Sequence, residues 1–169
     1  MVQSTSSNPN WTVKDNAFDN ETLSYTDAFG YVLRSNNGFI NTSNPMGGSS
    51  NVVVSGFTYA TGSLGPWYQS STNLIDKGSR TADQAGLYHY TTQTSQAKET
   101  NSVVDIGFHY VAADGNGNPL DYDGDGLPDY FEDRNGNGVT DTGETNWQDQ
   151  NDLGLKVWIT EPKNNSNIP

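Results

Sequence analysis

The sequence has no cysteine, little positive charge and no long apolar run. The absence of cysteine excludes disulfides, thiolate metal sites and thiol nucleophiles. Only 8 of the 169 residues are Lys or Arg and they form no basic stripe, so we expect no nucleic-acid binding. No stretch of about 18 apolar residues occurs, so we expect no membrane span. The polar N-terminus lacks a signal peptide and residues 161–169 are typical of a linker, so we expect a fragment or processed piece of a longer protein.

Two features of the composition favour opposite conclusions about whether the chain folds. Few aliphatic residues and a net charge of −12 together meet a compositional rule for disorder. However, the chain also holds six Phe, nine Tyr, four Trp and 18 Gly. Disordered acidic segments are poor in aromatic residues. The composition therefore favours a folded, mainly β protein with many turns.

The negative charge is concentrated in one segment. Residues 114–152 contain 11 of the 20 acidic residues and a single basic residue, Arg134. So many carboxylates in 39 residues repel one another unless cations neutralise them. Here they recur with glycine at fixed offsets, which predicts metal-binding loops rather than an acidic tail.

The segment from Asp121 to Glu132 matches the calcium-loop spacing at each diagnostic position. Gly126 stands at position six, where the chain turns sharply, and position twelve carries a long carboxylate that can bind through both oxygens. Ca²⁺ prefers about six to eight oxygen ligands, which this spacing supplies. The predicted ligands are Asp121, Asp123, Asp125, Asp129 and Glu132, with the backbone carbonyl of Leu127.

The same spacing repeats immediately, from Asp133 to Glu144. Its predicted ligands are Asp133, Asn135, Asn137, Asp141 and Glu144, with the carbonyl of Val139. We therefore expect two Ca²⁺ ions, with tighter binding in the first loop because it offers more carboxylates. A solvated loop without metal is the alternative. Two flanking half-motifs leave a third site open, although each is more typical of a turn: Asp114, Asn116 and Asn118, and Asp149 with Asn151.

The two loops lack the flanking helices of a calcium sensor. Residues 114–120 are turn-forming, and the second loop starts directly after Glu132, which leaves about one helical turn around Pro128–Asp133. Without paired helices there is no apolar groove to open on binding. We therefore expect calcium to fold and stiffen this segment.

The run from Asp121 to Glu144 resembles the tandem calcium loops of thrombospondin type 3 repeats, in the form found in large bacterial surface and secreted proteins. The resemblance implies a rigid spacer in which calcium ions are wrapped in series. This chain lacks the cysteines of animal members and has only two complete loops. It is unlike dockerins, whose calcium loops are separated by helices, so cohesin binding is not expected.

Residues 1–113 contain short β-like runs between turn clusters. The first three runs start 20 and 21 residues apart, and a longer gap predicts an inserted loop at Gly62–Gly86. This period favours a β-solenoid, with an antiparallel sandwich as the alternative. The expected strands are Trp11–Val13, Tyr31–Leu33, Val52–Thr58, Leu87–Thr92 and Val103–Val111.

Three segments, Asn16–Asn20, Ala82–Tyr90 and Val104–Tyr110, resemble the last coils of right-handed parallel β-helices in bacterial surface proteins. This resemblance implies earlier coils upstream and an extracellular or cell-surface location. An uncovered first coil would expose a strand edge, so self-association through that edge, or through the C-terminal strand expected at Leu155–Thr160, is a hypothesis.

Parallel β-helices often carry polysaccharide lyases or hydrolases, so an enzyme is the main alternative to a structural protein. The candidate groups are Asp76, Lys77, Arg80, Asp83, His89 and His109, but sequence does not bring two carboxyls together. An ion pair in the loop and packed histidines are the plainer interpretation, and we expect no enzyme. A carbohydrate-binding module is also open, with a sugar platform built from Trp67, Tyr68, Tyr88 and Tyr90.

The sequence thus predicts three parts. Residues 1–113 form the β-solenoid, residues 114–152 form the tandem calcium loops, and residues 153–169 form a strand at Leu155–Thr160 followed by a linker. Trp147 is expected to pack beneath the calcium loops. The predicted function is a calcium-binding structural connector that supports spacing, assembly or adhesion.

Overall fold

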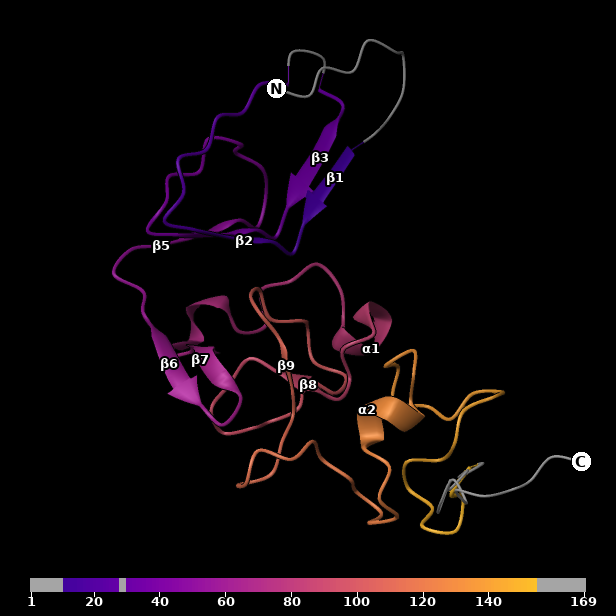
Figure 1. Ribbon diagram of the computed structural model, residues 1–169. Helices are drawn as coiled ribbons and strands as arrows, with labels where there is room; N and C mark the ends of the chain where they lie inside the picture. Colours follow the sequence, from indigo (N-terminus) through magenta and orange to yellow (C-terminus); the bar gives the residue numbers. More distant parts are fainter. Residues whose placement is uncertain (1–10, 28–29, 155–169) are drawn as a thin grey trace, which may run out of the picture.

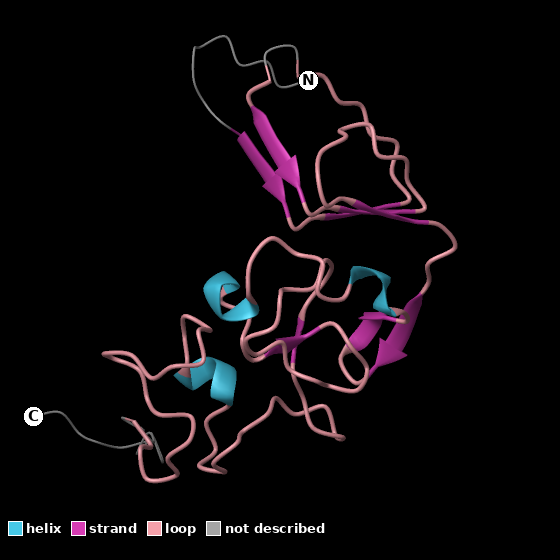
Figure 2. Cartoon of the chain, turned by 180° about the vertical axis from the view of Figure 1, so that it is seen from behind, coloured by secondary structure: helices cyan, strands magenta, loops and turns pink. Residues whose placement is uncertain are grey.

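A computed structural model describes residues 11–27 and 30–154 and shows short strands joined by long loops (Figures 1 and 2). The expected mainly-β character is confirmed. The strand expected at Leu155–Thr160 lies outside the described residues. The elements are β1 (Trp11–Lys14), β2 (Ala17–Asp19), β3 (Val32–Ser35), β4 (Gly38–Ile40), β5 (Val52–Val54), β6 (Tyr59–Gly62), β7 (Gly65–Gln69), η1 (Thr72–Leu74), α1 (Ala82–Ala85), β8 (Tyr90–Thr91), β9 (Tyr110–Val111) and α2 (Asp129–Glu132).

Strands β1 to β5 pair in parallel, layer upon layer. β1 pairs with β3, and β4 lies between β2 and β5. Ala17 is in register with Gly38, 21 residues later, as the expected period predicts. Val52, however, is in register with Gly38 and not with Tyr31, so the next step is 14 residues. The expected second step of about 21 residues is therefore wrong, because the intervening turn is shorter.

A row of asparagines explains this register. The Oδ1 of Asn37 accepts the backbone N–H of Asn16 at 3.2 Å, and the Oδ1 of Asn51 accepts the N–H of Asn37 at 2.9 Å. The residue before each asparagine has a positive φ, which Asn, Asp and Gly adopt most readily: Asp15, Asn36 and Ser50. Stacked left-handed corners and amide rungs thus align the three layers.

The second half of the expected solenoid domain is built differently. β6 pairs with β7 and β8 with β9, both antiparallel. The segment expected as an inserted loop, Gly62–Gly86, contains β7, η1 and α1. The strands form four small separate sheets, so a parallel solenoid does not describe residues 59–111. The single-solenoid expectation for residues 1–113 is corrected accordingly.

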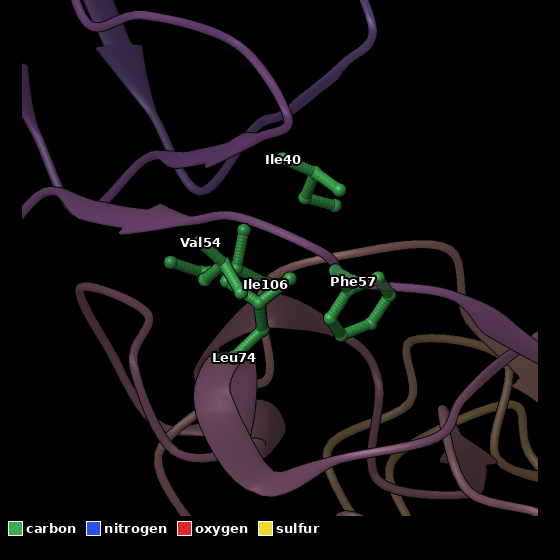
Figure 3. Packing of buried hydrophobic residues seen from close by; sticks show 5 residues of the cluster. All are labelled: Ile40, Val54, Phe57, Leu74 and Ile106. Carbon is green, nitrogen blue, oxygen red and sulfur yellow. The ribbon is translucent and has the colours of Figure 1, made fainter.

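One apolar cluster joins the two halves. Ile40 of β4 and Val54 of β5 pack with Leu74 of η1 and with Ile106, and Phe57 completes the cluster (Figure 3). Leu74 and Ile106 are almost fully buried. The parallel layers therefore share a core with the antiparallel half.

The acidic segment extends this body (Figure 1, orange to yellow). The N–H of Leu120 bonds to the carbonyl of Ala112 at 2.9 Å, and the N–H of Asp129 bonds to the carbonyl of Leu120 at 2.9 Å. α2 is the single helical turn expected around Pro128–Asp133. Within the described residues, every helix is too short to cross a membrane.

Candidate metal centre

The first acidic loop folds around its own carboxylates. Asp121 accepts the N–H of Gly124 at 2.8 Å and that of Gly126 at 2.9 Å, one on each oxygen. Asp123 and Asp125 each accept the N–H two residues ahead, at 3.2 and 2.6 Å. Gly126 has φ +93°, which favours glycine and allows the chain to turn at position six. These bonds curl the backbone so that alternate side chains face one point.

Three carboxylates converge at that point. One oxygen from each of Asp121, Asp123 and Asp125 lies within 4.8 Å of the others, and all three residues are half-buried. Burial raises the pKa of Asp123, and the charges of Asp125 and Asp121 add to the rise. Such a concentration of negative charge is unfavourable unless a cation neutralises it.

Glu132 supplies the second and stronger indication. Its side chain comes from the last residue of α2 and is 1% exposed. Neither carboxylate oxygen has a well-formed hydrogen bond among the described residues, and one oxygen of Asp123 also lacks one. Burial raises the pKa of Glu132 to about 7. The Thr145 side chain, the one donor that acts on this carboxylate, lowers the pKa, and the charges of Asp123, Asp125 and Asp129 raise it further. A buried carboxylate with so little compensation is costly, so these oxygens fit a bound cation.

The donor chemistry indicates which cation fits. Every side chain predicted as a ligand in the first loop offers oxygen, which hard cations such as Ca²⁺ prefer over nitrogen or sulfur ligands. Asp121, Asp123, Asp125 and Glu132, with the carbonyl of Leu127, are the residues that would hold it. The bidentate reach expected of Glu132 stays a prediction.

Asp129, at position nine, lies apart from this cluster. Its Oδ1 accepts the N–H of Tyr122 at 2.6 Å, and its Oδ2 lies 3.2 Å from Nζ of Lys98 and 3.6 Å from Nδ1 of His89. Burial alone would raise its pKa, but these three donors lower it. The structure thus gives both oxygens of Asp129 other partners, and its role as a ligand is not favoured.

The second loop has the same backbone curl but satisfies its side chains internally. Asp133 accepts the N–H groups of Asn137 at 3.2 Å and Gly138 at 2.6 Å, and it also contacts His89. The side-chain amides of Asn135 and Asn137 donate to Asp141 and lower its pKa. Glu144 accepts three backbone N–H groups, those of Arg134, Asn135 and Asp141. Binding here would require these side chains to give up their internal bonds; the role of the Val139 carbonyl stays a prediction.

The two flanking half-motifs are turns in the structure. Asp114 accepts the N–H groups of Asn116 and Asn118 on the same oxygen. Asp149 accepts the N–H of Asn151 at 3.1 Å. Both arrangements are local bonds of the Asx-turn type. They favour the turn interpretation over a third metal site.

The catalytic candidates from the sequence are dispersed. His89 lies at the acidic segment, whereas His109 lies 2.9 Å from Glu99. The loop ion pair expected among Asp76, Arg80 and Asp83 is not formed within the described residues. Lys77 contributes its backbone carbonyl to a bond with Asn36. Among the described residues, only Arg80 and His109 of these candidates line a common cavity, and neither is paired there with a second candidate carboxyl from the sequence.

Two cavities that sequence did not reveal border Asp105. One, of about 200 Å³, is lined by residues including Asp76, Lys98 and Glu99, and the other, of about 250 Å³, by residues including Arg80 and His109. Burial raises the pKa of Asp105 to about 6. Hydrogen bonds from Thr92 and from the N–H of Asp76 lower this pKa, and the nearby Glu99 raises it by a smaller amount. Asp105 is 4% exposed and lacks any sequence motif that would have identified it.

The aromatic residues proposed as a sugar platform do not share one surface. Trp67 is 51% exposed and packs edge-on against Tyr59, whereas Tyr68 is fully buried and stacks on Tyr110. Tyr88 packs against His89. Trp147 is buried and contacts Tyr88 and Tyr122, so it packs against the first loop as expected.

Comparisons with protein-family models, with curated proteins and with solved structures found no match to this chain.

Proposed function

We propose that residues 114–152 form a calcium-binding connector and that the chain is a structural module of a bacterial surface protein. The observation that carries the proposal is the carboxylate of Glu132, which is buried, has no well-formed hydrogen bond among the described residues and is repelled by the charges of Asp123 and Asp125. A bound Ca²⁺ neutralises this cluster and stiffens the loops. The chemistry that the ion supplies is charge neutralisation and coordination of oxygen ligands.

A structural role is favoured over a sensor role. α2 is a single turn of four residues, and the two loops follow each other without a helix pair. Calcium sensors act by opening such a pair, which this segment lacks. A stiffened connector matches the spacer function implied by the thrombospondin type 3 resemblance.

The parallel layers of β1 to β5 support the proposal that residues 11–54 are coils of a right-handed β-solenoid. Among the strands of residues 11–27 and 30–154, β1 and β2 each pair on one side only, with β3 and β4. Their other edges carry backbone groups open to another strand, so we extend the proposal to self-association of the chain through this edge, in an extracellular or cell-surface setting. Sedimentation with calcium present tests this, and a monomer at high concentration would contradict it.

Carbohydrate binding is a second candidate function, favoured by the half-exposed Trp67 beside Tyr59. Exposed indoles stack on sugar rings. A glycan array with and without calcium, repeated with Trp67→Ala, tests this candidate. If glycan binding is unchanged in Trp67→Ala, Trp67 is not part of the sugar-binding surface.

The calcium proposal is tested by titration calorimetry and by thermal unfolding with and without a chelator. We expect the native chain to bind Ca²⁺ and to melt at lower temperature in chelator. Glu132→Gln should weaken binding in the first loop because the amide replaces a charged ligand. Glu21→Gln is the matched control, since Glu21 is exposed and lies outside the acidic segment. Absence of heat on calcium addition, with an unchanged melting temperature, would overturn the proposal.

A further inference from the structure

A buried ionic cluster joins the acidic segment to the β-rich body. His89, from the segment between α1 and β8, lies between Asp129 and Asp133, and the side chains of all three are at most 2% exposed. Lys98 reaches the same point from the body, 3.2 Å from Asp129. Burying charged groups is costly unless their partners are well placed, so this arrangement depends on both parts being folded.

Both ring nitrogens of His89 contact charged side chains. Nε2 lies 3.0 Å from Oδ2 of Asp133, and Nδ1 lies 3.6 Å from Oδ2 of Asp129 and 3.5 Å from Nζ of Lys98. The ring thus connects the two aspartates to the lysine. Lys98 is held further by the ring of Trp147, 4.9 Å away.

The two aspartates in this cluster also shape the calcium loops. Asp129 accepts the N–H of Tyr122 in the first loop, and Asp133 accepts the N–H groups of Asn137 and Gly138 in the second. Glu132, the buried carboxylate that fits a cation, lies three residues after Asp129 and directly before Asp133. The residues that anchor the segment to the body therefore bracket the proposed ligand.

Resting on the proposed calcium function, we infer that His89 and Lys98 are positioning residues. They couple calcium occupancy of the loops to the folded state of residues 57–113, the part of the β-rich body that contacts the acidic segment. They hold α2 so that Glu132 stays buried at the first loop. Coupling between two sites is reciprocal. Calcium binding therefore stabilises residues 57–113 as well as the loops themselves.

Hydrogen–deuterium exchange of the native chain tests this coupling directly. The N–H of Ala112 bonds to the carbonyl of His89 at 3.0 Å, and that of Gln69 bonds to Thr92 at 2.7 Å, both within the body. We expect calcium to slow exchange at these amides by about fivefold or more, the lower end of typical coupling factors. The amides of Asn20 and Asn41, in the parallel layers, serve as internal controls and should change least.

A pair of uncharged substitutions isolates the contacts of His89. His89→Leu removes both contacts, whereas His89→Gln keeps one donor and one acceptor at similar reach. We expect His89→Leu to weaken calcium binding by about fivefold or more and to abolish the slowed exchange in the body. His89→Gln should restore both, which a loss of packing alone would not predict.

The outcomes separate this inference from the function on which it rests. If the native chain binds no calcium, the proposed function fails and the inference with it. If calcium binds but slows exchange only within residues 114–152, the calcium function stands and the coupling is overturned. Equal calcium affinity in His89→Leu and the native chain overturns it as well. Should His89→Leu fail to fold, the exchange measurement on the native chain decides the question.

Discussion

The Nε2 of His89 lies 3.0 Å from Oδ2 of Asp133 and so joins the β-rich body to the second acidic loop. Around this contact the two parts interlock through backbone as well: the N–H of Tyr88 bonds to the carbonyl of Gly136 at 3.0 Å. The acidic segment is thus packed onto the body by specific contacts. The predictions below test these contacts and the core that supports them.

Gly138→Ala should destabilise the docking of the second loop. Gly138 has φ +80°, and a Cβ there would overlap the ring of Tyr88. The left-handed conformation alone costs a non-glycine residue about 1–3 kcal/mol. Gly143→Ala is the matched control, because Gly143 has φ +95° and open space around it. Thermal unfolding should show a larger loss for Gly138→Ala; equal losses would contradict the packing against Tyr88.

Asn37→Ala should destabilise the parallel layers. Asn37 is fully buried, and its side-chain amide donates to the carbonyls of Val13 at 2.9 Å and Ser35 at 3.1 Å. Its removal leaves buried backbone groups without partners, at about 1–3 kcal/mol. Urea denaturation measures the loss. The exposed Asn16, in the outermost rung, is the comparison, and Asn16→Ala should cost less.

Leu74→Ala should destabilise the whole body. Leu74 is 1% exposed and packs in the cluster that joins β4 and β5 to Ile106. The cavity left by such a truncation typically costs about 2–5 kcal/mol. Leu33→Ala, at a residue that is 54% exposed in β3, should cost far less in the same denaturation experiment. A small effect at Leu74 would show that the two halves do not share a core.

Stability should fall as the pH rises from about 4 to about 6, and Asp105 contributes to this fall together with Glu132, whose pKa is also raised. Burial raises the pKa of Asp105 from 3.8 to about 6, so in this range the folded chain holds a proton that the unfolded chain has released. Binding more protons when folded means that unfolding becomes easier as pH rises.

Asp105→Asn removes this titration and should reduce the slope of the stability profile between those pH values, leaving the part that Glu132 contributes. The exposed Asp76, whose N–H donates to Asp105, gives the control Asp76→Asn, which should leave the slope unchanged. Chemical denaturation at several pH values, in chelator to exclude metal effects, measures both. A native slope that persists in Asp105→Asn would assign the effect to other groups.

Sequence reasoning and structure agree best where the interactions are local. The curl of the first loop depends on bonds that reach at most five residues, such as that from the N–H of Gly126 to Asp121. Alternating carboxylates and a glycine at position six are enough to predict it. The spacing of the β-like runs also predicts the parallel step of 21 residues, but it does not predict the step of 14 to β5, because the turn before β5 is shorter.

The oxygen-rich loops, the single turn of α2 and the concentration of charge can be predicted from the sequence, because each follows from residues close together along the chain. The burial of Glu132, the contacts of Asp129 and Asp133 with His89, and the place of Asp105 beside two cavities arise only when the chain folds. These features depend on contacts across 44 residues, as between His89 and Asp133, and on burial by distant segments. Spacing in the sequence carries no signal for either.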